Sequence, residues 1–286
     1  MPLVCADLAE YGVILLPPGS HEYRDLLSGI ERSLKIHPDG RPPVEQRDFD
    51  RITEHRDNSA ILVNLAPVAI ASLAYIWSVR TDGRIRTHCF LPGTHASILL
   101  PFYWTDRIKK FDAFWNTIFP GSSRLLIPEA GKIYGDNTDV RAPAQDELRL
   151  GDCFVTLVPG GFDGIRESVK LSLDGVFFAD GGFAGPNQLG SWEHLVAARE
   201  TYLSYAVEAR ESDRAGFFDR MQQARGAAPL VMPSPYEGLD GSAIREYQRQ
   251  QIAHSVLLMR ERLGDTATLA AVAAWRETPG PEPHRL

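Results

Sequence analysis

Residues 167–187, ESVKLSLDGVFFADGGFAGPN, decide how this chain is divided. Apolar and polar residues alternate in the first half of the stretch, which is typical of a β-strand with one buried face. The apolar residues of that face are Val169, Leu171 and Leu173. Two Asp-Gly steps follow, Asp174-Gly175 and Asp180-Gly181, and this dipeptide suits tight hairpin turns. The stretch therefore predicts the last strands of a β-domain.

The two aspartates of this stretch have two interpretations. As a pair of carboxylates, Asp174 and Asp180 would suggest acid–base chemistry. Each of them directly precedes a glycine, however, and turn formation explains that pattern more simply. We therefore expect both aspartates to shape turns rather than to act on a substrate.

A helical region is predicted after the stretch, over residues 189–276. Gly185-Pro186-Asn187 ends the β-pattern, and Ser191 is a fitting N-cap for the first helix. Apolar residues at helical spacing predict a shorter helix around Phe217 and a longer one from Ser242 to about Leu263. Residues 265–275 add a last helix, and the proline-rich tail, 277–286, is predicted to be disordered.

Towards the N-terminus, residues 59–188 are predicted to form the β-domain. Short apolar strands alternate with turn signals, as in an antiparallel sandwich or barrel. The predicted strands are 61–65, 70–79, 84–90, 95–103, 123–127 and 153–158. Residues 1–58 contribute a helix from about 21 to 36, capped by Ser20, and a charged connector. The expected fold class is α+β: an antiparallel immunoglobulin-like β-sandwich with an N-terminal helix and a C-terminal helical segment.

One short segment of the sequence resembles a segment of other proteins. Residues 173–181, LDGVFFADG, followed by Gly185-Pro186-Asn187, are similar to a phrase in uncharacterised bacterial proteins with an immunoglobulin-like sandwich. The resemblance covers residues 60–187 and implies a fold but no activity. The hallmark tryptophan between two bridged cysteines is missing, because Trp77 precedes both Cys89 and Cys153.

Composition and charge argue against some classes of partner and favour one cellular compartment. The 286 residues have a net charge of −7 and no Lys/Arg-rich block, which argues against a nucleic-acid partner. No apolar run is long enough for a membrane span. The first twenty residues lack the basic region of a secretory signal, so we expect a cytoplasmic protein, with a removed signal peptide as the alternative. Three widely spaced cysteines favour reduced thiols, and a bridge between Cys89 and Cys153 is the alternative.

Motifs for catalysis, metal or cofactor binding are incomplete. There is no Gly-x-Ser-x-Gly elbow and no phosphate-binding loop. His88 and His95 flank a predicted turn, but zinc needs three or four ligands. Asp136 and Asp139 lie in an oxygen-rich loop without the spacing of a calcium-binding EF-hand. We expect no metal and no cofactor.

An aromatic helix, predicted at about 104–119 as an insertion in the β-domain, is the strongest candidate binding site. Its ligand- or partner-binding candidates are Trp104, Phe111, Phe114 and Trp115, more aromatic residues than one helix face usually buries. The pattern nevertheless favours a helix that covers the open edge or end of the sandwich, and a binding site is the alternative to that interpretation.

These observations predict a non-catalytic binding or protein-interaction protein, with an unknown protein or small molecule as its ligand. The alternative is a hydrolase-like enzyme whose Asp and His residues meet only in the folded chain. The residues of that alternative are His88, His95, Asp136, Asp139 and Asp163. The C-terminal helices are expected to pack within the chain, and a homodimer through them is the alternative.

Overall fold

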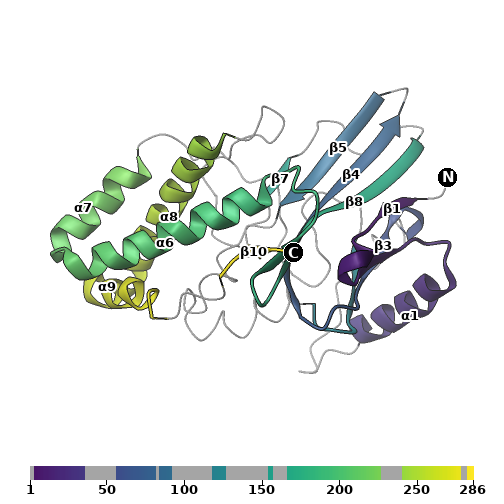
Figure 1. The fold of residues 1–286 in the computed structure, drawn as a ribbon, viewed down its shortest axis with the longest axis horizontal. Helices are drawn as coiled ribbons and strands as arrows, with labels where there is room; N and C mark the ends of the chain where they lie inside the picture. Colours follow the sequence, from purple (N-terminus) through teal and green to yellow (C-terminus); the bar gives the residue numbers. More distant parts are fainter. Residues whose placement is uncertain are drawn as a thin grey trace.

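The computed structural model describes residues 3–35, 56–81, 84–91, 118–126, 154–156, 166–226, 240–277 and 282–286. Within these residues the chain forms two β-sheets and five α-helices (Figure 1). No helix among them is long and apolar enough to cross a membrane.

One sheet has seven strands and the other has three. The larger sheet contains β1 (Val4–Ala6), β4 (Ile70–Thr81), β5 (Arg84–Leu91), β7 (Phe154–Thr156), β8 (Arg166–Phe178), β9 (Gly182–Ala184) and β10 (His284–Arg285). Its order is β10-β9-β8-β4-β5-β7, and β1 also pairs with β8. The smaller sheet has the order β2-β3-β6, formed by Val13–Leu16, Ala60–Asn64 and Ser123–Leu126.

The predicted immunoglobulin-like antiparallel sandwich is wrong. The larger sheet is mixed: β1 lies parallel to β8, and β10 lies parallel to β9, while the other pairings are antiparallel. Only β4 with β5 and β8 with β9 are antiparallel pairs of strands that lie close together along the described chain, and a sequence pattern can indicate such local pairs. The two parallel strands come from opposite ends of the chain, and no local pattern predicts such pairings.

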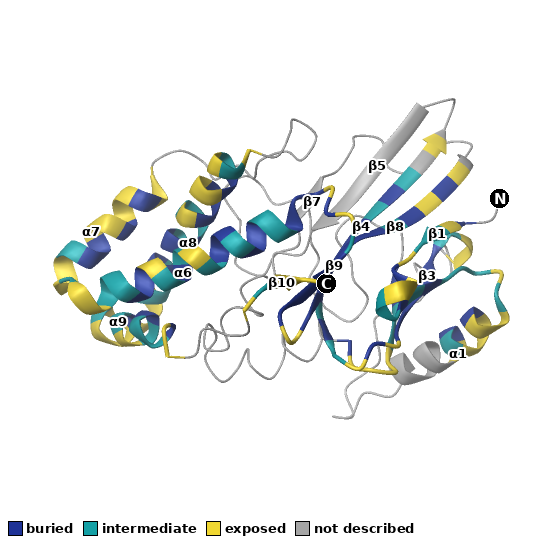
Figure 2. Ribbon diagram, in the orientation of Figure 1, coloured by how far each residue is buried: buried dark blue, intermediate teal, exposed yellow. Residues whose placement is uncertain are grey.

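Strand β8 is one continuous strand that contains a bulge. Leu173 pairs with Tyr75 and Gly175 pairs with Ala74, so Asp174 has no partner on β4. An extra residue reverses the alternation of side chains. Before the bulge the odd-numbered residues 169, 171 and 173 face the core between the sheets, and after it the even-numbered residues 176 and 178 do. The predicted buried face is confirmed (Figure 2), but Asp174-Gly175 is not a hairpin turn.

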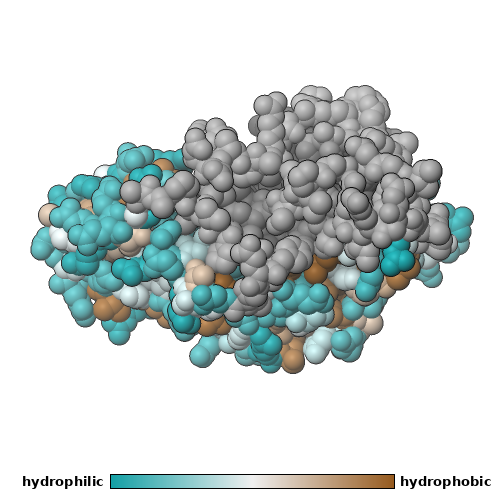
Figure 3. Space-filling view, turned by 90° about the horizontal axis from the view of Figure 1, so that it is seen from above, coloured by the Kyte–Doolittle hydropathy of each residue, from teal (hydrophilic) through white to brown (hydrophobic). Residues whose placement is uncertain are grey.

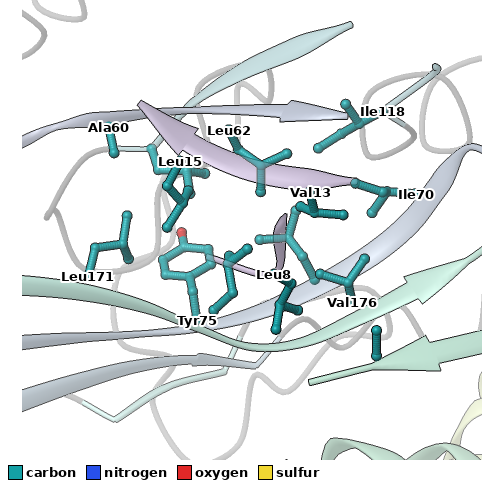
Figure 4. Close-up of a cluster of buried hydrophobic side chains, with 14 of the residues drawn as sticks. Leu8, Val13, Leu15, Ala60, Leu62, Ile70, Tyr75, Ile118, Leu171 and Val176 are labelled. Carbon is teal, nitrogen blue, oxygen red and sulfur yellow. The ribbon is translucent and has the colours of Figure 1, made fainter. Parts of the chain in front are cut away.

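The two sheets share the first core. Side chains of the smaller sheet and those of β4 and β8 point towards one another (Figure 4). Leu62 of β3 and Leu171 of β8 are both fully buried there. On the outer face of the smaller sheet lies α1 (His21–Lys35), whose Tyr23 and Leu27 pack on β3. The predicted cap is confirmed, because the Tyr23 N–H bonds to Ser20 Oγ at 3.1 Å.

A second core joins the larger sheet to the remaining helices, α6 (Ser191–Glu211), α7 (Arg214–Arg225), α8 (Gly241–Leu263) and α9 (Asp265–Ala274). Phe177 of β8 and Phe183 of β9 belong to this core, with ring centroids 4.7 Å apart. The face of the helical region in Figure 3 is mostly hydrophilic. Helix residues such as Leu195, Phe218 and Ile252 are buried in the second core, so they pack within the chain.

Candidate functional site

The aromatic residues predicted as a binding site lie outside the described part of the chain. These residues are Trp104, Phe111, Phe114 and Trp115. Only the last two positions of their predicted helix are described: Ile118 forms a β-bridge with Ile70, and Phe119 is 46% exposed. The structure therefore does not test this site.

His88 is the one residue of the hydrolase alternative that lies within the described residues. His95, Asp136, Asp139 and Asp163 lie outside the described residues. His88 belongs to β5, at the register position opposite Trp77 of β4. The enzyme alternative stays a prediction.

A connected group of polar contacts lies at the β9–α6 junction, which we define as Asp174, strand β9 and residues 187–194. Asp174 is its centre. One carboxylate oxygen accepts the N–H of Gln188 at 2.7 Å, and the other accepts that of Leu189 at 2.9 Å. Its carbonyl oxygen accepts the N–H of Asn187 at 2.8 Å. Burial raises the pKa of Asp174, and the two N–H groups oppose that shift. Both carboxylate oxygens are used to hold the turn before α6.

Gly190 occupies the N-cap position of α6 in place of the predicted Ser191, and the side chain that bonds to the first turn is that of Asn187. The backbone of Asn187 is left-handed, with φ of 62°, a conformation that asparagine tolerates. Its side-chain oxygen accepts the Trp192 N–H at 2.8 Å, and its amide donates to Glu193 Oε2 at 2.7 Å. Asn187 thus orients the first turn of α6 and fixes the carboxylate of Glu193.

A buried polar pair links α6 to α8 behind this turn. The side-chain amide of Gln248 donates to Nδ1 of His194 at 3.0 Å, and the ring of Tyr247 meets that of His194 edge-on. Burial lowers the pKa of His194 to about 4, although the nearby Glu193 carboxylate opposes this shift. His194 is therefore neutral at pH 7. Ser191 is also fully buried, and its hydroxyl has no hydrogen-bond partner in the part of the chain that the structure describes.

Strand β10 adds residues from within the predicted disordered tail to the edge of the junction. It runs parallel to β9, with Arg285 opposite Phe183. The N–H of His284 donates to the Gly181 carbonyl at 3.0 Å, and the N–H of Leu286 donates to the Phe183 carbonyl at 2.9 Å. Figure 1 shows β10 at the place where the larger sheet meets the helices.

The side chain of Arg285 lies in what we call the arginine slot, formed by Phe183, Trp192 and Glu193. Its guanidinium carbon is 5.3 Å from the centre of the Trp192 ring and 6.0 Å from that of Phe183. Its Nη2 donates to Glu193 Oε1 at 3.3 Å. The side chains of Arg285 and Glu193 are 53% and 35% exposed, respectively, so the slot is open to solvent.

The two layers of the junction differ in what they can do. Asp174 and His194 are buried and hydrogen-bonded, which suits a role in positioning α6. The slot presents an aromatic pair and a carboxylate to a segment at the surface, and the β9 edge presents the carbonyls of Gly181 and Phe183, which suits binding. Among the described residues, no three His, Cys, Asp or Glu side chains are grouped so that they could hold a metal.

Sequence reasoning missed the slot. The sequence places Trp192 in the first predicted helix after Ser191, and Arg285 in the predicted disordered tail. The one local signal was the motif His284-Arg285-Leu286 after a run of prolines, which is too short to indicate a strand. Comparison of the chain with family models, curated proteins and solved structures found no match.

Proposed function

We propose that this chain is a non-catalytic protein-interaction protein that holds an extended polypeptide segment at the edge of β9. Strand addition of this kind gains affinity from main-chain hydrogen bonds and specificity from side-chain pockets. The observation that supports the proposal is β10 itself, which occupies the edge through two main-chain hydrogen bonds and places one side chain in a slot.

The contacts of β10 are few enough for the segment to leave the edge. Its two hydrogen bonds contribute about 0.5–1.5 kcal/mol each, the exposed ion pair about 0–1 kcal/mol, and the cation–π contact about 0.5–1 kcal/mol. Ordering the backbone of the last few residues costs about 1–2 kcal/mol per residue. Each of these gains is small, so the edge is expected to open and to accept another segment.

The edge itself is rigid enough to receive a partner. Phe183 is 2% exposed and packs against Phe177 in the second core. Asp180, in the turn before β9, accepts the Gly182 N–H at 3.0 Å, and the Gly181 N–H bonds to the Phe178 carbonyl at 3.0 Å. The carbonyl groups that bind β10 are therefore held in place by the turn and the core.

A titration followed by NMR tests this proposal. The chain shortened to end at Glu277 is titrated with a synthetic peptide that has the sequence of residues 277–286. We expect the amide signals of residues 181–184 and the indole signal of Trp192 to shift. A matched peptide with proline in place of Leu286 lacks the N–H that bonds to Phe183 and should bind more weakly. Folded protein that shows no shifts at millimolar peptide would contradict the proposal.

A further inference from the structure

We infer that the arginine slot selects partner proteins by an arginine in an extended segment, and that β10 is the resident competitor for this slot. This inference rests on the proposed function and adds to it the chemistry of the partner. It concerns the slot residues Phe183, Trp192 and Glu193, where the observed occupant is Arg285.

The shape of the slot suits a guanidinium better than an ammonium. A guanidinium is planar, stacks on aromatic rings and donates in a fixed fork. The guanidinium carbon of Arg285 is 5.3 Å from the Trp192 ring centre while Nη2 reaches Glu193. A lysine ammonium is compact and strongly hydrated, so it gains less from the same rings.

The slot is held in place by residues other than Arg285. The amide of Asn187 fixes Glu193 Oε2 at 2.7 Å. The rings of Phe183 and Trp192 lie 5.6 Å apart, and Phe183 is anchored in the second core. Because Arg285 contributes none of these contacts, the slot should persist when the tail leaves.

Strand register defines the rest of the motif. Arg285 is opposite Phe183, and the residue after it donates its N–H to the Phe183 carbonyl. The methyl groups of that residue, Leu286, lie over Gly182, where an added Cβ would be 3.3 Å from them. The partner segment is therefore extended and carries an arginine followed by an apolar residue.

The structure favours a different protein over a second copy as the partner. The tail of each copy already reaches the slot of its own chain. A tethered segment has an effective concentration in the millimolar range, so the tail of another copy cannot compete with it at ordinary protein concentrations. A partner from another protein can add contacts beyond β9 and so displace β10.

Peptide selectivity in the full-length chain tests the inference. Three peptides with the sequence of residues 277–286 carry Arg, Lys or Gln at the position of Arg285, and each is titrated by NMR into the wild type and into Arg285→Gln. We expect the variant to bind the Arg peptide more tightly than the wild type does. In the variant, the Lys peptide should bind at least about threefold more weakly than the Arg peptide. The Gln peptide should bind about tenfold more weakly than the Arg peptide.

A matched pair of variants locates the effect. In the Arg285→Gln background, Glu193→Gln should weaken binding of the Arg peptide and reduce its preference over the Gln peptide. Glu200→Gln, an exposed change on the same helix, should leave both unchanged. Equal effects of the two substitutions would overturn the assignment of the slot.

The remaining outcomes separate this inference from the proposed function. Equal binding of all three peptides, with shifts along β9, would leave strand addition intact and overturn the arginine slot. No shifts with any peptide would contradict the proposed function itself. The inference would also be overturned if the wild type sedimented as a dimer and Arg285→Gln as a monomer. The slot would then be occupied by the tail of a second copy.

Discussion

The carboxylate of Asp174 accepts the backbone N–H of Leu189 at 2.9 Å, so the bulge of β8 holds the turn that leads into α6. Leu189 itself is buried against Ala74 of β4. This contact fixes where α6 begins, and with it the positions of Trp192 and Glu193. The buried aspartate therefore supports the slot without touching the segment that the slot binds.

Replacement of Asp174 should destabilise the protein strongly. Asp174→Ala leaves the N–H groups of Gln188 and Leu189 without their acceptors, and we expect a loss of about 2–4 kcal/mol in the free energy of unfolding. Asp180→Ala is the matched control, because Asp180 also precedes a glycine but is exposed and accepts one turn N–H. Asp180→Ala should lower the free energy of unfolding by about 0.5–1.5 kcal/mol. Urea denaturation measures both, and equal losses would contradict this account.

Gly185 should not tolerate a side chain. Its φ is 129°, and an added Cβ would lie 2.6 Å from the carbonyl oxygen of Asp174. Gly185→Ala is therefore expected to lower the free energy of unfolding by about 2–4 kcal/mol. Gly19→Ala is the control, because an added Cβ there meets no atom within 4 Å. A thermal midpoint of Gly185→Ala equal to that of the control would show that this close approach is absent.

The sequence predicts the first part of strand β8 better than the part that begins at Asp174. The alternation through Leu173 predicts a strand with one buried face, and the structure confirms it. At Asp174 the Asp-Gly step predicts a turn. The structure instead has a bulge at which the carboxylate of Asp174 is buried, and the same dipeptide is compatible with both. The groups that decide between them, the N–H groups of Gln188 and Leu189, lie 14 and 15 residues further along the chain. Asp180-Gly181, whose contacts are local, does form the predicted turn.

The candidate site was less predictable than the helices. The α7 and α8 segments follow from apolar spacing, which is a local property. The arginine slot combines Phe183, Trp192 and Arg285, and the ion pair that completes it joins residues 92 positions apart. A sequence pattern contains no signal for that contact, because two backbone pairings of β10 create it.

Stability should depend on pH through His194. Its pKa is about 4 in the folded protein and about 6.5 when unfolded. Between these values the unfolded chain binds more protons, so stability is full above pH 6.5 and is lost as the pH falls towards 4. The loss is on the order of 3 kcal/mol. Protonation would also point an N–H of His194 at the Gln248 amide, which now donates to that nitrogen.

The buried Asp174 changes the stability with pH in the opposite direction to His194. The contribution of His194 is therefore measured by comparing the wild type with a variant that lacks this histidine. The raised pKa of Asp174 means that the folded state holds this proton more tightly, and stability falls as the pH rises through that raised value. Urea denaturation of the wild type and of His194→Gln at pH 4.5 and pH 7 separates the two effects. The wild type should lose more stability than the variant at pH 4.5. A constant difference between them would contradict the assigned pKa of His194.

Packing of α8 can be tested by a core substitution. Ile252 is 2% exposed and lies in the second core with Phe218 and Tyr202. Ile252→Ala should lower the free energy of unfolding by about 2–4 kcal/mol. Leu263→Ala, at a side chain that is 42% exposed, should cost less than about 1 kcal/mol. Because α8 packs against helices of its own chain, the unfolding midpoint should not change with protein concentration. A midpoint that rises with concentration, and a rise that Ile252→Ala abolishes, would instead support the alternative, a homodimer through the C-terminal helices.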